Sequence, residues 1–211
     1  MATDTRPTAK LTPKGLRTRA RIVDAAAELV HERGVAGTTL EDVKAAAQVS
    51  GSQLYHYFAD KEALVQAVID RQADAIVTTT EQAGLDTVEG LRAWRDLVVA
   101  EAGRLDGRGG CPLGSLGGQL AESDARARAR VSVGFGRWST VIGQGLAALH
   151  AAGRLRPGID PDDLAVTLLC ALQGALLLAQ IQRDSLPLET ALDTVLALSL
   201  SPGVTFGQRA G

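Results

Sequence analysis

The sequence has few aromatic and few sulfur-containing residues. Among its 211 residues are two Trp, two Tyr, three Phe, two Cys and one Met. The cysteines, Cys111 and Cys170, are far apart and belong to no CxxC or Cys/His motif, so the sequence predicts neither a disulfide framework nor a zinc site. We therefore expect a reducing, cytoplasmic setting, and no metal or cofactor.

The chain also lacks a large net charge, a secretory signal and a long uninterrupted apolar run. Its formal net charge is −2, which argues against a protein that coats nucleic acid indiscriminately. Residues 1–21, up to Arg21, are basic and contain no apolar run, which excludes a signal peptide. The stretch from Leu164 to Ile181 is interrupted by polar residues and is shorter than the roughly 20 residues of a membrane span. We interpret it as a buried helix and expect no membrane partner.

No arrangement typical of an enzyme is present. The three histidines, His31, His56 and His150, are scattered. The Gly107–Gly110 segment lacks the GK[ST] ending of a phosphate-binding loop. The sequence therefore predicts no catalytic residue and a protein that is not an enzyme.

Helical signals occur along the whole chain, and no stretch alternates with the period of two that favours a strand. Apolar spacing and cap residues predict about nine helices: Lys14–Arg33, a short helix opened by Thr39, Gly51–Tyr57, Lys61–Gln82, Thr87–Leu105, Pro112–Ala121, Asp124–Ala152, Pro161–Gln182 and Pro187–Leu200. The expected fold class is all-α.

Two of these helices are short and close together. Thr39 with Asp42, and Ser50 with Gln53, have the spacing of capping boxes, and only residues 48–50 separate the helices that they open. Two short helices joined by such a turn predict a helix-turn-helix, which sets a recognition helix in the DNA major groove. We expect a basic arm over 1–13, a DNA-binding domain over 14–60 and a helical domain over 61–211, with the helix from Lys61 linking the last two.

The second short helix also holds an unusual concentration of aromatic residues. Tyr55, Tyr57 and Phe58 are three of the seven aromatics in the chain. If Leu54 and Phe58 face inward, with Tyr57 also in the core, the opposite face consists of Ser52, Gln53, Tyr55 and His56. Hydrogen-bonding groups and neutral rings of this kind suit base edges and phosphates.

The segment TTLEDVKAAAQVSGSQLYHYFADKEALVQAVI resembles the DNA-binding domain of the TetR family of bacterial transcriptional repressors, from about Arg17 to Ile69. The resemblance implies phosphate contacts by Thr39 and Lys61, backbone contacts by Tyr55 and His56, and base contacts by Ser50, Gly51, Ser52 and Gln53, of which Gln53 best suits adenine. The sequence departs from the family at Gln48, where a turn glycine is common, and at Gly51, where a lysine is frequent.

Structural roles remain open for several of these residues. Thr39 and Ser50 would cap helices in a protein that never met DNA, and His56 alone would be an ordinary surface histidine. The basic arm suits either DNA contact or simple solvation.

The helical domain resembles the ligand-binding and dimerisation domain of the same family. Its last two helices are apolar around much of their circumference, which predicts a homodimer through a four-helix interface formed by Leu168, Leu172, Ala175, Leu176, Ala179, Leu192, Val195 and Leu196. The resemblance implies a pocket for a small hydrophobic effector, to which we assign Trp94, Cys111, Leu113, Phe135, Trp138 and Gln144. The alternative to the dimer interface is that these two helices form the core within one chain. The alternative to ligand contact is that the tryptophans only pack in the core.

The segment GGCPLGSLG resembles a motif from a branch of the family that responds to drugs, flavonoids or electrophiles. A helix start and Arg108 would favour the thiolate of Cys111 and make it a candidate sensor. The alternative is that Cys111 is only a small residue fitted into a tight Gly-rich corner. Cys170 is expected to be packed and inert. The main prediction is a repressor that an effector releases from a pseudo-palindromic operator in double-stranded DNA. The alternatives are a redox- or electrophile-sensing repressor acting through Cys111, and an architectural DNA-binding protein without an effector.

Overall fold

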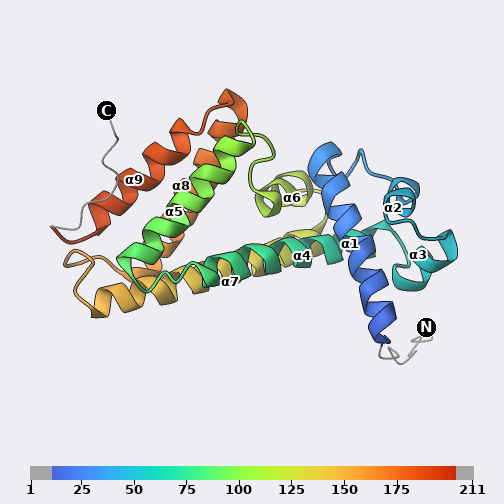
Figure 1. Ribbon diagram of the computed structural model, residues 1–211, viewed down its shortest axis with the longest axis horizontal. Coiled ribbons are helices and arrows are strands. Elements are labelled where there is room, and N and C mark those ends of the chain that lie inside the picture. The colour runs from blue at the N-terminus through green and yellow to red at the C-terminus, as the bar shows by residue number, and fades with distance from the viewer. Residues whose placement is uncertain (1–10, 203–211) are drawn as a thin grey trace. The chain divides into compact units, whose positions relative to one another are not determined.

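The computed structural model describes residues 11–202, and this part of the chain is built from helices (Figure 1). Its nine helices are α1 (Pro13–Arg33), α2 (Leu40–Ala46), α3 (Gly51–Tyr57), α4 (Lys61–Gln82), α5 (Val88–Arg104), α6 (Pro112–Leu120), α7 (Ala125–Ala151), α8 (Pro161–Gln182) and α9 (Leu186–Ser199). Over these residues there is no strand, only one isolated bridge between Leu155 and Leu200. The all-α prediction is confirmed. Residues 1–10 of the predicted basic arm lie outside the described residues.

Side-chain caps explain where several helices begin. Thr39 and Ser50 each close a capping box, in which the cap hydroxyl accepts the N–H of Asp42 or Gln53 at 3.1 Å and the cap N–H donates back at 2.9 Å. Asp60 accepts a first-turn N–H of α4 at 2.7 Å. Because each such cap satisfies otherwise unpaired backbone donors, it contributes about 1 kcal/mol.

The chain divides into two compact units, and the boundary falls between Val68 and Ile69, within α4. The first unit contains α1, α2, α3 and the beginning of α4. Its buried side chains come from all four helices and include Ile22, Val23, Ala26, Val43, Leu54, Phe58, Leu64 and Val65. Together they form the core on which α3 rests.

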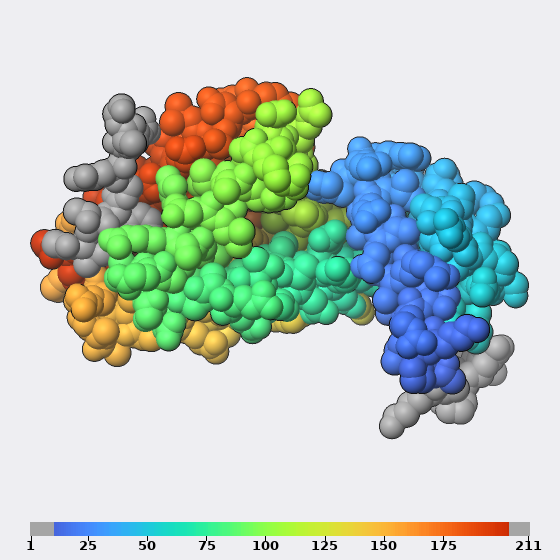
Figure 2. All heavy atoms as spheres, in the orientation of Figure 1, coloured from blue at the N-terminus to red at the C-terminus, as the bar shows by residue number. Residues whose placement is uncertain are grey.

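The second unit contains the rest of α4 and the helices α5–α9. Within it α6 packs on α7, α7 on α8, α8 on α9, and α5 on α9. The green α5 and the red α9 lie side by side in Figures 1 and 2. The largest fully buried side chains of the unit include Trp94, Leu91, Leu113, Ile142, Leu146, Leu168, Leu172 and Leu188.

The faces of α8 and α9 differ from those predicted for a dimer interface. Six of the eight residues proposed for it are buried inside the chain: Leu168, Leu172, Ala175, Ala179, Leu192 and Leu196. Leu176 and Val195 are half-buried. The six buried residues therefore pack against their own unit and do not face a second copy of the chain, whereas Leu176 and Val195 stay partly accessible.

Helix α8 has an apolar outer face as well. Within residues 11–202, it is the one helix long and apolar enough to cross a membrane, with a mean hydropathy of 2.0 over its most apolar window. Only 39% of that window is buried in the chain. The stretch from Leu164 to Ile181, which the sequence predicted to be a buried helix, is therefore buried on one side only.

Candidate nucleic-acid interface and ligand cavity

Helix α3 has one buried and one exposed face. Leu54 and the following Phe58 are 1% and 2% exposed and fix the helix to the core of the first unit. The opposite face presents Ser52, Gln53, Tyr55 and His56, all of which are exposed, Tyr55 to 58%. The two faces are those that the sequence predicted. Tyr57, expected in the core, is only half-buried.

The turn between α2 and α3 is held by contacts from both sides. Gln48 adopts a left-handed conformation with a φ of +51°, which a residue with a side chain adopts at a cost of about 1 kcal/mol. The adjacent Val49 N–H donates to the Lys44 carbonyl at 3.2 Å. From α1, Arg21 Nε donates to the Ala47 carbonyl at 2.9 Å. The turn is therefore strained at Gln48, where the family commonly has a glycine, and Arg21 braces it.

Sequence reasoning missed two contacts of α1 with this region. It counted Arg21 only as part of a basic segment, although its partner lies 26 positions further along the chain. It also missed Arg19, whose guanidinium carbon lies 5.1 Å from the centroid of the Phe58 ring. A cation over an aromatic ring is stabilising, so these two arginines help to position α3.

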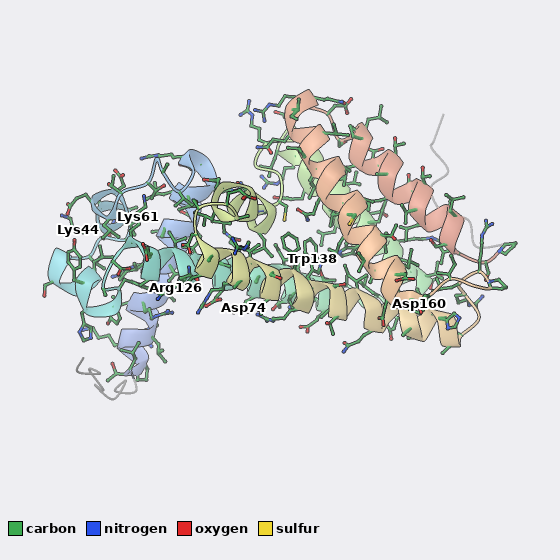
Figure 3. The ribbon with its side chains drawn as sticks, turned by 180° about the vertical axis from the view of Figure 1, so that it is seen from behind. Lys44, Lys61, Asp74, Arg126, Trp138 and Asp160 are labelled. Carbon is green, nitrogen blue, oxygen red and sulfur yellow. The ribbon has the colours of Figure 1, made fainter. Side chains whose placement is uncertain are left out.

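The capping boxes use part of the hydrogen-bonding capacity predicted for DNA. The Thr39 hydroxyl accepts the Asp42 N–H. The same hydroxyl and the Thr39 N–H both donate to the Asp42 carboxylate, and these two bonds hold the pKa of Asp42 below its usual range. Gln53 Oε1 accepts the Ser50 N–H, which leaves the Gln53 amide donors unused by the cap. Gly51 and Lys61 are half-buried at the first positions of α3 and α4, and Lys61 is labelled in Figure 3.

A cavity of about 530 Å³ lies within the second unit, lined by α4, α5, the α5–α6 connection, α7 and α8. This volume lies in the range of cavities that hold drug-sized molecules. Trp94 and Trp138 both line it, and Figure 3 shows Trp138 pointing inward from α7. The Trp138 indole N–H donates to Thr80 Oγ1 at 2.9 Å, so the ring is fixed at the cavity wall.

The residues predicted to bind an effector fall into two groups. Trp94, Cys111 and Trp138 line the cavity. Leu113, Phe135 and Gln144 are not among its lining residues. Leu113 is fully buried, Phe135 stacks on Trp138 with ring centroids 6.2 Å apart, and Gln144 is exposed on α7. The expectation that Gln144 supplies polarity inside the cavity is wrong.

Comparison with known proteins matches both units. Residues 22–68 match the model of bacterial regulatory proteins of the tetR family, and residues 87–195 match the tetracyclin repressor-like C-terminal domain. The chain belongs to the TetR family. An uncharacterized HTH-type transcriptional regulator of Mycobacterium tuberculosis is 30% identical over 183 residues, covering 81% of this chain and 88% of the relative.

Solved structures of TetR-family proteins share the fold. The regulatory protein TetR from Rhodobacter sphaeroides is similar with a TM-score of 0.78 and 25% identity, over 86% of this chain and 98% of that one. The complex of SmeT with triclosan is similar with a TM-score of 0.67 and 27% identity, over 91% and 96% of the two chains. SmeT is described as the repressor of a Stenotrophomonas maltophilia multidrug efflux pump.

The cysteines of this TetR-family regulator differ from the prediction. Cys111 is 8% exposed, and burial raises the pKa of its thiol, although the Gly114 N–H donates to Sγ at 3.3 Å. The helix start therefore does not favour the thiolate here, since the loss of hydration outweighs it, and the burial of Cys111 agrees with the alternative of a small packed residue. Cys170 was expected to be packed but is exposed. A neutral, buried thiol gives no support to redox sensing through Cys111.

The TetR-family regulator also has an exposed apolar surface on its two C-terminal helices. Along α8 the exposed positions include Val166, Cys170, Gly174, Leu177 and Ile181, which repeat every three or four residues. Beside them, a groove of about 560 Å³ runs between α8 and α9. It is lined by Ala171, Leu178, Gln182, Leu186, Pro187, Thr190, Ala191, Thr194 and Val195. We call this stripe and groove together the outer α8–α9 surface.

Proposed function

We propose that this TetR-family regulator is a cytoplasmic homodimeric repressor that binds a pseudo-palindromic operator and is released by a small hydrophobic effector. The observation that carries the proposal is the exposed polar face of α3, held over buried Leu54 and Phe58 by a braced turn. Such a helix fits the major groove, and a two-fold dimer would place two of them in successive grooves.

Different side chains would make the base and backbone contacts. Ser50, Gly51, Ser52 and Gln53 form the beginning of α3, the part of a recognition helix that reaches base edges. The unused amide donors of Gln53 suit adenine N7. Tyr55 and His56 would contact the backbone, and Thr39 and Lys61 would contact phosphates, where a helix start favours an anion.

The outer α8–α9 surface supports the homodimer. Val166, Leu177, Leu178, Ile181 and Leu186 are large apolar side chains of this surface that are at least 45% exposed. A contiguous patch of this kind is costly in water and marks an interaction surface. A second copy of the chain is the occupant proposed for it, because TetR-family regulators are dimeric.

The cavity of the second unit supports control by an effector. Its volume and its two tryptophan walls suit an apolar molecule, and the related SmeT has been solved with triclosan. An effector bound there would favour a conformation in which the two recognition helices no longer fit both half-sites. Helix α4 belongs to both units and would transmit that change.

Fluorescence anisotropy and footprinting on the DNA around its own gene test the proposal. We expect a protected, two-fold-symmetric site with a specificity ratio above about 10³ over unrelated DNA. Tyr55→Phe and Lys61→Ala should weaken binding to all DNA, and Lys61→Ala should reduce the salt dependence. Arg183→Asn removes one positive charge from the second unit and serves as the control. Weak binding without sequence preference would instead support an architectural role.

A further inference from the structure

The charged residues around the cavity are unequally compensated. Two of the lining residues, Glu101 and Arg108, carry a full charge at neutral pH. Glu101 accepts hydrogen bonds from Arg104 at both of its oxygens, at 2.7 and 2.9 Å. Its negative charge is therefore neutralised by a neighbour on the same helix.

Arg108 has no such partner within residues 11–202, although it lines the same cavity. Its backbone is held, because the Arg108 N–H donates to the Leu105 carbonyl at 2.9 Å. The preceding Gly107 has a φ of +67° and packs so closely on α8 that a Cβ there would lie 2.2 Å from the Ala179 carbonyl oxygen. The guanidinium thus extends from a fixed point at the cavity wall.

The beginning of α6 adds to the positive potential at the same end. Cys111 is the N-cap of this nine-residue helix and Pro112 its first residue, and both line the cavity. The start of a helix carries a partial positive charge. Because the Cys111 thiol is neutral, it provides no negative charge to offset the helix start or Arg108.

The remaining walls are aromatic or aliphatic, and most of their polar groups are already bonded. The Thr80 hydroxyl donates to the Ile76 carbonyl and accepts the Trp138 N–H, and the Thr79 hydroxyl donates to the Ala75 carbonyl. The amide of Gln72 is the uncharged exception. The cavity therefore combines an apolar body with one uncompensated cationic end.

We propose that the effector of this cavity is an aromatic monocarboxylic acid, whose ring lies against Trp94 and Trp138 and whose carboxylate pairs with Arg108. The proposal deepens the proposed function and rests on it. A carboxylate matches the planar guanidinium with two parallel hydrogen bonds. A neutral molecule of the same shape would leave the charge of Arg108 without a partner.

Tryptophan fluorescence and calorimetry test the proposal, since both tryptophans of the chain line the cavity. The probes are naphthalene-2-carboxylate, its neutral carboxamide and 2-naphthylmethylammonium. We expect the carboxylate to bind about tenfold more tightly than the carboxamide, a modest factor because Arg108 is exposed. Raising the salt concentration should reduce this preference.

Substitutions of Arg108 separate charge from shape. Arg108→Gln should lose the preference for the carboxylate, and Arg108→Glu should prefer the ammonium probe. Arg126→Gln removes an exposed arginine of α7 that does not line the cavity, and should behave like the parent. Because the side chain of Arg108 has no partner, its variants should unfold at the parent's temperature.

The outcomes distinguish this inference from the function on which it rests. Equal binding of the acid and the amide, or an Arg108→Gln variant that still prefers the acid, would overturn the carboxylate assignment and leave the cavity as an effector site. If no probe binds, both the assignment and the effector site fail. If the acid binds but does not release operator DNA, the binding assignment stands and its role in repression fails.

Discussion

Arg95 of α5 and Asp193 of α9 form an ion pair with two hydrogen bonds, Nε to Oδ1 and Nη2 to Oδ2, each 2.7 Å long. The side chains are only 16% and 21% exposed. Arg95 and Asp193 are 98 positions apart in the sequence, and their pair joins α5 to α9. It therefore helps to fix α9 to the rest of its unit.

Replacing Asp193 with asparagine should destabilise the protein. Asparagine can accept only one of the two bonds and leaves the Arg95 charge poorly compensated, which we expect to cost about 1–2 kcal/mol in this partly buried setting. Urea unfolding followed by circular dichroism measures the change. Asp96→Asn is the control, because Asp96 also bonds to Arg95 but is 69% exposed, and it should cost less than about 0.5 kcal/mol. Equal losses in both variants would contradict the assigned role.

The same ion pair shows what the sequence can and cannot predict. Helix starts depend on local residues, so Thr39, Ser50 and Asp60 could be assigned as caps from spacing alone. No local pattern connects Arg95 with Asp193. The pairing becomes visible only when α5 packs on α9.

The prediction of which face of α8 is buried was wrong for a related reason. Apolar residues occur around its whole circumference, so periodicity does not reveal which stripe packs inside the unit. The helices around it decide, and they bury Leu168 and Leu172 while leaving Leu177 and Cys170 exposed. The exposed face of α3 could be predicted because Leu54 and Phe58 are the only large side chains in residues 50–58 that carry no polar atom.

Gln53 should affect both stability and DNA recognition, since its amide oxygen serves the capping box and its amide donors are unused by the cap. Gln53→Ala removes both functions and should cost about 1 kcal/mol of stability as well as change sequence preference. Gln53→Glu keeps an acceptor for the Ser50 N–H, so it should fold normally but bind DNA weakly, because it adds a negative charge and loses the donors.

Thermal unfolding and anisotropy on operators with single base changes measure the two effects separately. If Gln53→Ala weakens binding to every sequence by the same factor, Gln53 does not read a base. If Gln53→Glu is as unstable as Gln53→Ala, the capping role of its side-chain oxygen is contradicted.

The outer α8–α9 surface should control the oligomeric state. Leu177 is 56% exposed in the chain, so Leu177→Glu should leave the fold of one chain intact and place a charge in the dimer interface. Analytical ultracentrifugation should show a shift from dimer toward monomer, with unchanged helix content. Val133→Glu, at a 63% exposed position of α7, should remain dimeric. A dimeric Leu177→Glu protein would show that another surface joins the copies.

The two cysteines should differ in reactivity, because only Cys170 lies on the outer α8–α9 surface, whereas Cys111 lines the cavity. Cys170 is exposed in the chain but lies on the outer α8–α9 surface, so the parent dimer should protect it from N-ethylmaleimide, and Leu177→Glu should make it react faster. Cys111 should react slowly in both the parent and the Leu177→Glu protein, because it is buried and the pKa of its thiol is raised. Because the thiolate is the reactive form, the labelling rate of Cys111 should stay low at pH 7–8 and rise only at a pH above the usual thiol pKa of ~8.5. Mass spectrometry of Cys111→Ser and Cys170→Ser variants assigns each rate to one residue. Fast labelling of Cys111 at neutral pH would contradict the buried, neutral thiol, and equal labelling of Cys170 in the parent and Leu177→Glu would place it outside the dimer interface.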